Sequence, residues 1–197
     1  MIEYSGRYPI VIISTPRSGS TALTHYINQE LNSIPMFSEP DTNPELFSSF
    51  LETTKISNQY IVKIHAGRFD RYPDYILDQL FNSDEPYKIC IKRRNKIDQV
   101  VSLYIALCRN QWEYHNESQV EDTVPIDYPK VKKSIEILND LNNQLEQAKI
   151  KFDTILWYED FDFGELPVVK TPKPKNYEEL YTIASKMYNI INEVDVI

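Results

Sequence analysis

The 197-residue sequence has few of the residues that build metal sites and disulfide frameworks. It contains two cysteines and three histidines, and Cys90 and Cys108 lack the spacing of metal ligands. No apolar run is long enough to span a membrane, and no secretory signal is recognisable. Two cysteines without such a signal fit a reducing compartment. We therefore expect a cytoplasmic protein that has no metal site and does not contact membranes.

The sequence also lacks an excess of positive charge. Its net charge is −8, which argues against a general nucleic-acid binder. Hydrophobic residues make up 42% and charged residues 25%, as in ordinary globular proteins. This length can bury a substantial core, so we expect a single domain over residues 1–197. The oligomeric state stays open.

Glycine is scarce as well, with four in the chain, and one of them stands in the most informative stretch. Residues 9–14 form a short β-branched apolar run that predicts a buried strand. Residues 15–19, with a proline and a glycine, predict a tight turn. From Ser20 onward, apolar residues recur at helical spacing: Leu23, Ile27 and Leu31. The stretch therefore reads as strand, turn and helix.

This arrangement predicts an anion site. The first amide groups of a helix have no partner within it, and the helix dipole adds positive charge there. A turn with Gly19 lets an anion approach that backbone closely. The loop also carries one cation, Arg17, and three hydroxyls, those of Ser18, Ser20 and Thr21. Phosphate or sulfate would be held by amides, hydroxyls and a guanidinium together. The usual nucleotide loop needs Gly-Lys-Ser/Thr, which is absent.

The remaining chain alternates strands with helices, which predicts an α/β domain with a mainly parallel sheet. In such sheets ligands bind beyond the carboxyl ends of the strands. Three polar clusters fall at the ends of the predicted strands: the Arg17 loop, Lys63 with His65, and Arg93 with Arg94. The predicted strands are 9–14, 59–65, 87–93 and 152–157, and the predicted helices are 20–32, 44–56, 73–81, 96–112, 131–148 and 177–192.

Two motifs resemble those of the sulfotransferases that use 3′-phosphoadenosine 5′-phosphosulfate (PAPS). The loop TPRSGST is similar to their 5′-phosphosulfate-binding loop, Pro-Lys/Arg-Ser-Gly-Thr/Ser-Thr. Arg94, Asn95, Asp98 and Ser102 match their 3′-phosphate motif, in which a serine follows the arginine by eight residues. Lys96 replaces the usual proline. Residues 156–161 look like their Tyr-Glu-Asp segment, which follows a late strand.

The resemblance implies a three-layer P-loop-like fold and a metal-independent transfer from PAPS as sulfuryl donor. Arg17 would stabilise charge on the leaving phosphate, and the backbone amides from Ser18 through Gly19 and Ser20 to Thr21 would hold the 5′-phosphate. Arg94 and Ser102 would hold the 3′-phosphate. Tyr158 would lie near the adenine. The acceptor would be a small molecule or a glycan, which the sequence does not identify.

The chain also departs from the animal cytosolic members. Ala22 stands where they have an adenine-stacking tryptophan, and their C-terminal glycine-rich closing segment is missing. The basic run at residues 170–175 either replaces part of that segment or is a solvated linker. These departures are typical of compact bacterial- or phage-type members.

Two residues are candidates for the base that accepts the acceptor's proton, and the resemblance to bacterial members slightly favours Glu39. Glu39, in Ser-Glu-Pro, stands where several bacterial sulfotransferases place a catalytic carboxylate. His65 matches the histidine in the Lys-Thr-His stretch of cytosolic members. A neutral histidine can act near pH 7, whereas a glutamate needs desolvation to raise its pKa. Glu39 could instead cap a turn, and His65 could be a hydrogen-bonding residue at a strand end.

Two other functions stay open. One is a nucleotide kinase of the P-loop type, which the missing Gly-Lys-Ser/Thr disfavours. The other is a non-catalytic protein on the same fold that binds 3′-phosphoadenosine 5′-phosphate (PAP). A site with neither Glu39 nor His65 facing the sulfate would favour the second.

Overall fold

The computed structural model describes residues 6–32, 34–110, 123–161 and 173–193. Contacts within it define two compact units. The first comprises Met1–Lys92 and Leu141–Gly164, and the second comprises Arg93–Asp140 and Glu165–Ile197. The prediction of one domain over 1–197 stays a prediction.

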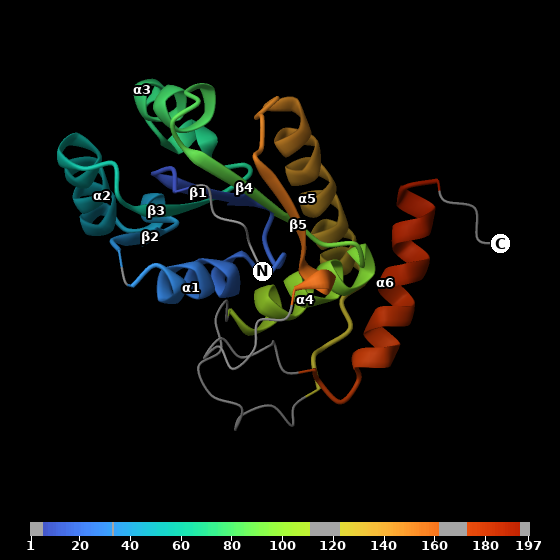
Figure 1. The fold of residues 1–197 in the computed structure, drawn as a ribbon. Coiled ribbons are helices and arrows are strands. Elements are labelled where there is room, and N and C mark those ends of the chain that lie inside the picture. The colour runs from blue at the N-terminus through green and yellow to red at the C-terminus, as the bar shows by residue number, and fades with distance from the viewer. Residues whose placement is uncertain (1–5, 33, 111–122, 162–172, 194–197) are drawn as a thin grey trace. The chain divides into compact units, whose positions relative to one another are not determined.

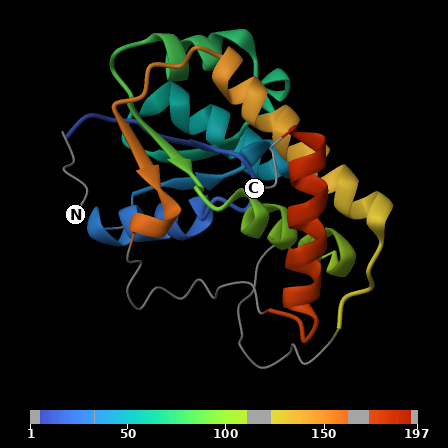
Figure 2. The ribbon, with the colours of Figure 1, turned by 90° about the vertical axis from the view of Figure 1, so that its right-hand side faces the viewer.

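The first unit is built on a parallel sheet whose strand order is β2-β3-β1-β4-β5. This confirms the prediction of an α/β fold with a mainly parallel sheet. Figure 2 shows β5 lying beside β4 at one edge. The sequence predicted four strands and missed the three-residue strand β2. The strands are β1 (Ile10–Ser14), β2 (Met36–Ser38), β3 (Ile61–His65), β4 (Tyr87–Lys92) and β5 (Thr154–Trp157).

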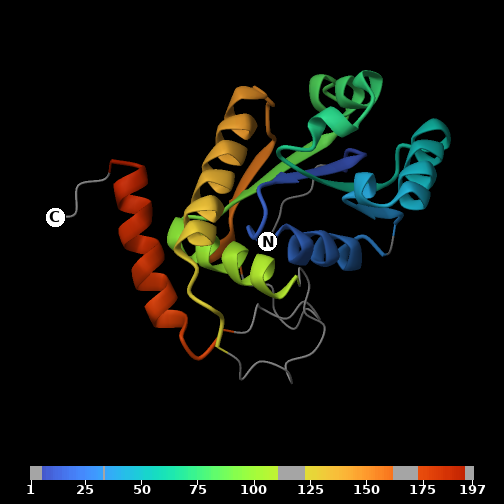
Figure 3. The ribbon, with the colours of Figure 1, turned by 180° about the vertical axis from the view of Figure 1, so that it is seen from behind.

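The central strand β1 is fully buried, and helices pack against both of its faces. Ile10 and Ile12 share a core cluster with Leu23 of α1 (Ser20–Glu30). Val11 belongs to a second cluster with Phe50 of α2 (Pro44–Ile56). Successive side chains of a strand point to opposite faces, so α1 covers one face and α2 the other (Figures 1 and 3). The first unit therefore has three layers.

The helix α2 begins where the sequence provides a cap. The side chain of Asn43 accepts hydrogen bonds from the first-turn amides of α2, and Pro44 occupies its first position. The predicted helix at 73–81 is α3 (Asp74–Leu77) continued by the π-helical turn η3 (Asp78–Asn82). Short 3₁₀ turns are η1 (Pro40–Thr42), η2 (Phe69–Arg71) and η5 (Tyr158–Asp160).

The second unit is helical. It contains α4 (Lys96–Arg109), the first part of α5 (Tyr128–Gln147) and α6 (Tyr177–Ile191). A core cluster joins residues of the three helices, including Val101, Ile135 and Leu180. The helix α5 begins three residues before the predicted start. Residues 111–112, predicted to end the α4 helix, and residues 170–172 of the basic run lie outside the described residues.

The sheet brings three chain segments together at the carboxyl ends of its strands. The register pairs Ser14 with His65 and Ser38 with Lys63, so β1, β3 and β2 end there side by side. The turn after β1, Glu39 after β2 and the end of β3 are therefore neighbours. Within the described residues, no helix is both long and apolar enough to cross a membrane.

Candidate functional site

The turn between β1 and α1 is held in a defined conformation. The hydroxyl of Ser18 donates a 2.8 Å hydrogen bond to the carbonyl of Thr15. Gly19 caps α1 with a left-handed backbone, φ +86°, and its carbonyl accepts from the amide of Leu23. Arg17 is also left-handed, at φ +62°. The sequence predicted the hydroxyl of Ser18 as an anion ligand, whereas the structure directs its proton into the turn.

Tyr158 packs directly on this turn. A methyl group added at Gly19 would lie 2.3 Å from the Tyr158 ring, so the ring contacts the glycine backbone. The contact brings the end of β5 against the loop. Tyr158 is therefore a neighbour of the predicted phosphate loop, and its predicted place near an adenine stays a prediction.

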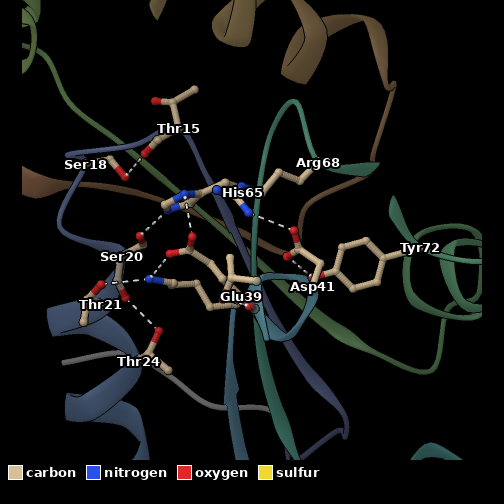
Figure 4. A network of polar contacts seen from close by, with 12 residues as sticks. Thr15, Ser18, Ser20, Thr21, Thr24, Glu39, Asp41, His65, Arg68 and Tyr72 are labelled. Atoms are coloured by element: carbon tan, nitrogen blue, oxygen red, sulfur yellow. Dashed lines mark hydrogen bonds and ion pairs between the residues drawn. The ribbon is translucent and has the colours of Figure 1, made fainter. Parts of the chain in front are cut away.

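His65 lies between the loop and Glu39 (Figure 4). Its Nε2 atom is 3.4 Å from the hydroxyl oxygen of Ser20, which begins α1. Its Nδ1 atom is 3.5 Å from Oε2 of Glu39. The two residues that the sequence offered as alternative bases therefore form one group, and that group faces the loop.

Lys63 completes the group, although it is not among the site residues predicted from the sequence. Its side chain is 1% exposed, yet its ammonium lies 2.7 Å from Oε1 of Glu39 and donates a 2.8 Å hydrogen bond to the hydroxyl of Thr21. A buried charge needs such partners. The available signal was a lysine inside a strand of otherwise apolar residues, two positions before the histidine.

The positive backbone angle of Glu39 aims its side chain at these partners. Glu39 has φ +50°, a conformation that non-glycine residues rarely adopt. Its amide donates to the carbonyl of Lys63, which fixes the end of β2 against β3. Residues held in strained conformations cluster at functional sites. Arg17 and Glu39 are two such residues in this site.

Burial and charge set the protonation of the pair. Burial lowers the pKa of His65 to about 4, although the charge of Glu39 opposes this. Burial alone would raise the pKa of Glu39, but nearby positive charge has the larger, opposite effect. This charge comes from His65 when its ring is protonated, and from Lys63 and Arg68. The pKa of Glu39 is therefore below its ordinary value. At neutral pH the imidazole is neutral and Glu39 is ionised.

A second polar network adjoins the first. The carboxylate of Asp41 is 1% exposed and accepts a 2.9 Å hydrogen bond from Nη1 of Arg68 and another of 2.9 Å from the hydroxyl of Tyr72. Asp41 lies in η1, two residues after Glu39. Glu39 is thus bound by residues of β3, and Asp41 is bound by residues that follow β3.

The predicted 3′-phosphate residues lie in the second unit. Arg94 is exposed just before α4, and Ser102 is partly buried within that helix. The side chain of Asn95 caps α4 by accepting from the amide of Asp98, and Asp98 pairs with Arg93 at 2.9 Å. Asn95 and Asp98 therefore shape the start of α4. Whether Arg94 and Ser102 share a ligand with Arg17 stays a prediction.

Of the basic run at residues 170–175, Lys173 lies in the described part of the second unit. Its ammonium is 4.0 Å from the centre of the Tyr177 ring, a cation–π contact at the start of α6. Its predicted role beside a nucleotide stays a prediction.

Comparisons with known proteins found likenesses among solved structures. No family model matches the chain, and no curated protein matches it in sequence. Among solved structures, the chain is similar to mouse sulfotransferase SULT7A1 complexed with PAP, at 16% identity and a TM-score of 0.47. The match covers 98% of this chain and 68% of the mouse chain.

Proposed function

We propose that this protein is a sulfotransferase that moves the sulfuryl group of PAPS to a hydroxyl or amine of a small-molecule or glycan acceptor. The observation that carries the proposal is the position of His65. Its Nε2 atom lies 3.4 Å from Ser20 at the N-terminus of α1, where amides and the helix dipole favour an anion. A proton acceptor thus adjoins an anion site, which transfer to a hydroxyl requires.

In this proposal His65 is the base and Glu39 supports it. With its Nδ1 proton directed at Glu39, the imidazole presents the Nε2 lone pair toward Ser20 and an incoming acceptor. As Nε2 takes the proton, the imidazolium is stabilised by the carboxylate 3.5 Å away. The low pKa of the resting His65 rises when a polyanionic donor binds beside it, because negative charge favours the protonated ring.

The cations of the loop and of β3 supply charge stabilisation. Sulfuryl transfer is an in-line displacement that depends on positioning and electrostatics, as phosphoryl transfer does. Arg17 stabilises charge that develops on the leaving phosphate. Lys63 donates a hydrogen bond to Thr21 and forms an ion pair with Glu39, so it fixes the loop and the carboxylate relative to each other. The transferring group carries less charge than a phosphoryl group, so the reaction needs no metal.

In this proposal, residues of the second unit determine the selectivity for the donor. Arg94 and Ser102 hold the 3′-phosphate and so separate PAPS from ATP. A guanidinium suits the binding of the 3′-phosphate because it can donate two parallel hydrogen bonds to a phosphate. Tyr158 contributes next to the loop, where its ring packs on Gly19.

The geometry disfavours a protein that only binds nucleotide. Such a protein has no need of a base at the anion site, yet His65 lies against Ser20 of the loop and Glu39 lies against His65. The kinase alternative still lacks the Gly-Lys-Ser/Thr sequence that positions phosphates and Mg²⁺. Transfer without added metal separates these alternatives.

The test is transfer of radiolabelled sulfate from PAPS to a panel of hydroxyl and amine acceptors in the presence of a chelator. We expect transfer by the native protein and its loss in Arg17→Ala, with PAP binding weakened only modestly. We expect His65→Gln to reduce kcat by at least 100-fold, the usual contribution of a positioned base. Unchanged turnover in Arg17→Ala would overturn the assignment of that residue.

A further inference from the structure

Arg68 lies beside the proposed base, and only part of its guanidinium group is bound by another side chain among the described residues. It lies in the turn after β3, three residues beyond His65, and its Nη1 atom is 2.9 Å from Oδ2 of Asp41. The carboxylate of Asp41 is 1% exposed and is also bound by Tyr72. The contact with Asp41 therefore fixes the orientation of the Nη1 group of Arg68.

The rest of the Arg68 guanidinium has no protein partner among the residues that the structure describes. Its side-chain hydrogen bond and ion pair both use Nη1, so the Nε and Nη2 donors remain available. The side chain is 31% exposed, so a ligand can reach it. Because Asp41 already orders the side chain, binding an anion there costs little further conformational entropy.

The position of Arg68 relates it to the acceptor side of the site. Its charge acts on both Glu39 and His65. In Figure 4 the Arg68 side chain and Ser20 lie on opposite sides of His65. The donor occupies the Ser20 side in the proposed function. A group held by Arg68 therefore belongs to the molecule that approaches His65 from the other side.

We propose that Arg68 forms an anion-binding subsite for the acceptor, and that the natural acceptor carries a carboxylate or sulfate close to the hydroxyl or amine that receives the sulfuryl group. This inference rests on the proposed function and specifies its substrate class. The planar Nε and Nη2 donors match the two oxygens of such a group. Arg68 is thus a specificity-determining residue, and Asp41 is the residue that positions it.

Arg71 provides a matched control. It also approaches Asp41, but its Nη1 atom is 3.6 Å away and its side chain is 55% exposed. It carries the same charge close to the same carboxylate without the fixed direction of Arg68. A general effect of local positive charge would involve both arginines, whereas a built subsite involves Arg68.

The experiment measures the binding of acceptor pairs that differ in one carboxylate. PAP-loaded protein is titrated calorimetrically with methyl β-glucuronide and methyl β-glucoside, and with 6-hydroxy-2-naphthoate and 2-naphthol. We expect the carboxylate member of at least one pair to bind ten times more tightly or better. Arg68→Gln should reduce this preference to within twofold, whereas Arg71→Gln should keep it. Arg68→Lys, which keeps the pair with Asp41 and so protects the fold, should lose most of the preference because it lacks the planar donors.

Equal binding of both members in each pair, including no binding of either, would overturn the subsite. So would a preference that survives in Arg68→Gln. The titrations are repeated without PAP, and PAP binding is measured separately. Failure of PAP to bind while the carboxylate preference depends on Arg68 would contradict the donor assignment alone. Normal PAP binding without any preference would contradict the subsite alone.

Discussion

The ammonium of Lys63 lies 2.7 Å from Oε1 of Glu39, although the lysine side chain is 1% exposed and belongs to a strand. A charge at such a depth is stable only while its partner is present. The pair therefore links the structure of the sheet to the position of the proposed catalytic group. We therefore expect Glu39 to affect stability as well as the proposed activity.

Glu39→Gln should destabilise the protein, because it leaves the charge of Lys63 buried without its counter-charge. We expect a loss of about 3 kcal/mol in the free energy of unfolding, measured with urea. Glu136→Gln, on an exposed α5 site, should change it by less than about 0.5 kcal/mol. The double variant Glu39→Leu with Lys63→Met should recover much of the loss. Equal stability of Glu39→Gln and the native protein would contradict the buried pair.

His65 should make the protein less stable in acid. Its pKa is about 4 in the folded protein against an ordinary 6.5, so between these values the unfolded chain binds a proton that the folded chain does not. This contribution to stability is complete above pH 6.5 and is lost as the pH falls toward 4. Between pH 7 and pH 5 the loss from His65 amounts to about 2 kcal/mol. Urea unfolding at both pH values should show a correspondingly smaller loss in His65→Gln, and an identical loss in both proteins would argue against a buried neutral histidine.

Gly19→Ala should damage the loop for two separable reasons. The residue has φ +86°, and an added methyl group would meet the Tyr158 ring at 2.3 Å. Gly6→Ala is the control, because Gly6 has φ +76° but no atom within 4 Å of an added methyl group. Gly6→Ala should cost about 1 kcal/mol from the backbone alone. Gly19→Ala should cost more and should weaken PAP binding, whereas equal effects of the two variants on stability would show that the Tyr158 contact is unimportant.

Arg94→Ala should reduce selectivity for the 3′-phosphate. We expect the affinity for PAP to fall at least tenfold, because a charged hydrogen bond to phosphate is lost. The affinity for adenosine 5′-phosphosulfate, which lacks the 3′-phosphate, should change little. Lys96→Ala tests whether any nearby positive charge suffices, and it should leave the selectivity intact. Equal losses for both ligands in Arg94→Ala would remove the residue from the proposed site.

Local patterns made much of the first unit predictable. The β-branched run at residues 9–14 and the turn with Gly19 predicted β1, the loop and the start of α1 from neighbouring residues alone. Asn43 and Pro44 likewise marked the start of α2. By contrast, β2 has three residues and depends on its pairing with β3, so no period in the sequence could reveal it.

The composition of the site was less predictable because it depends on register. Glu39 and His65 are far apart in sequence and looked like alternatives, but the pairing of Ser38 with Lys63 places them in one group. The sequence placed Lys63 with His65 at the carboxyl end of a strand, but only the fold shows that the Lys63 side chain is buried against Glu39. The network of Asp41, Arg68 and Tyr72 carries no sequence motif and became visible only in the structure.

The most direct test of the donor assignment is a calorimetric titration of the purified protein with PAP in the presence of a chelator, compared with ATP and Mg²⁺. We predict that PAP binds without metal and at least tenfold more tightly than ATP with Mg²⁺. Binding of ATP only with Mg²⁺, and none of PAP, would contradict a sulfotransferase and favour a nucleotide kinase.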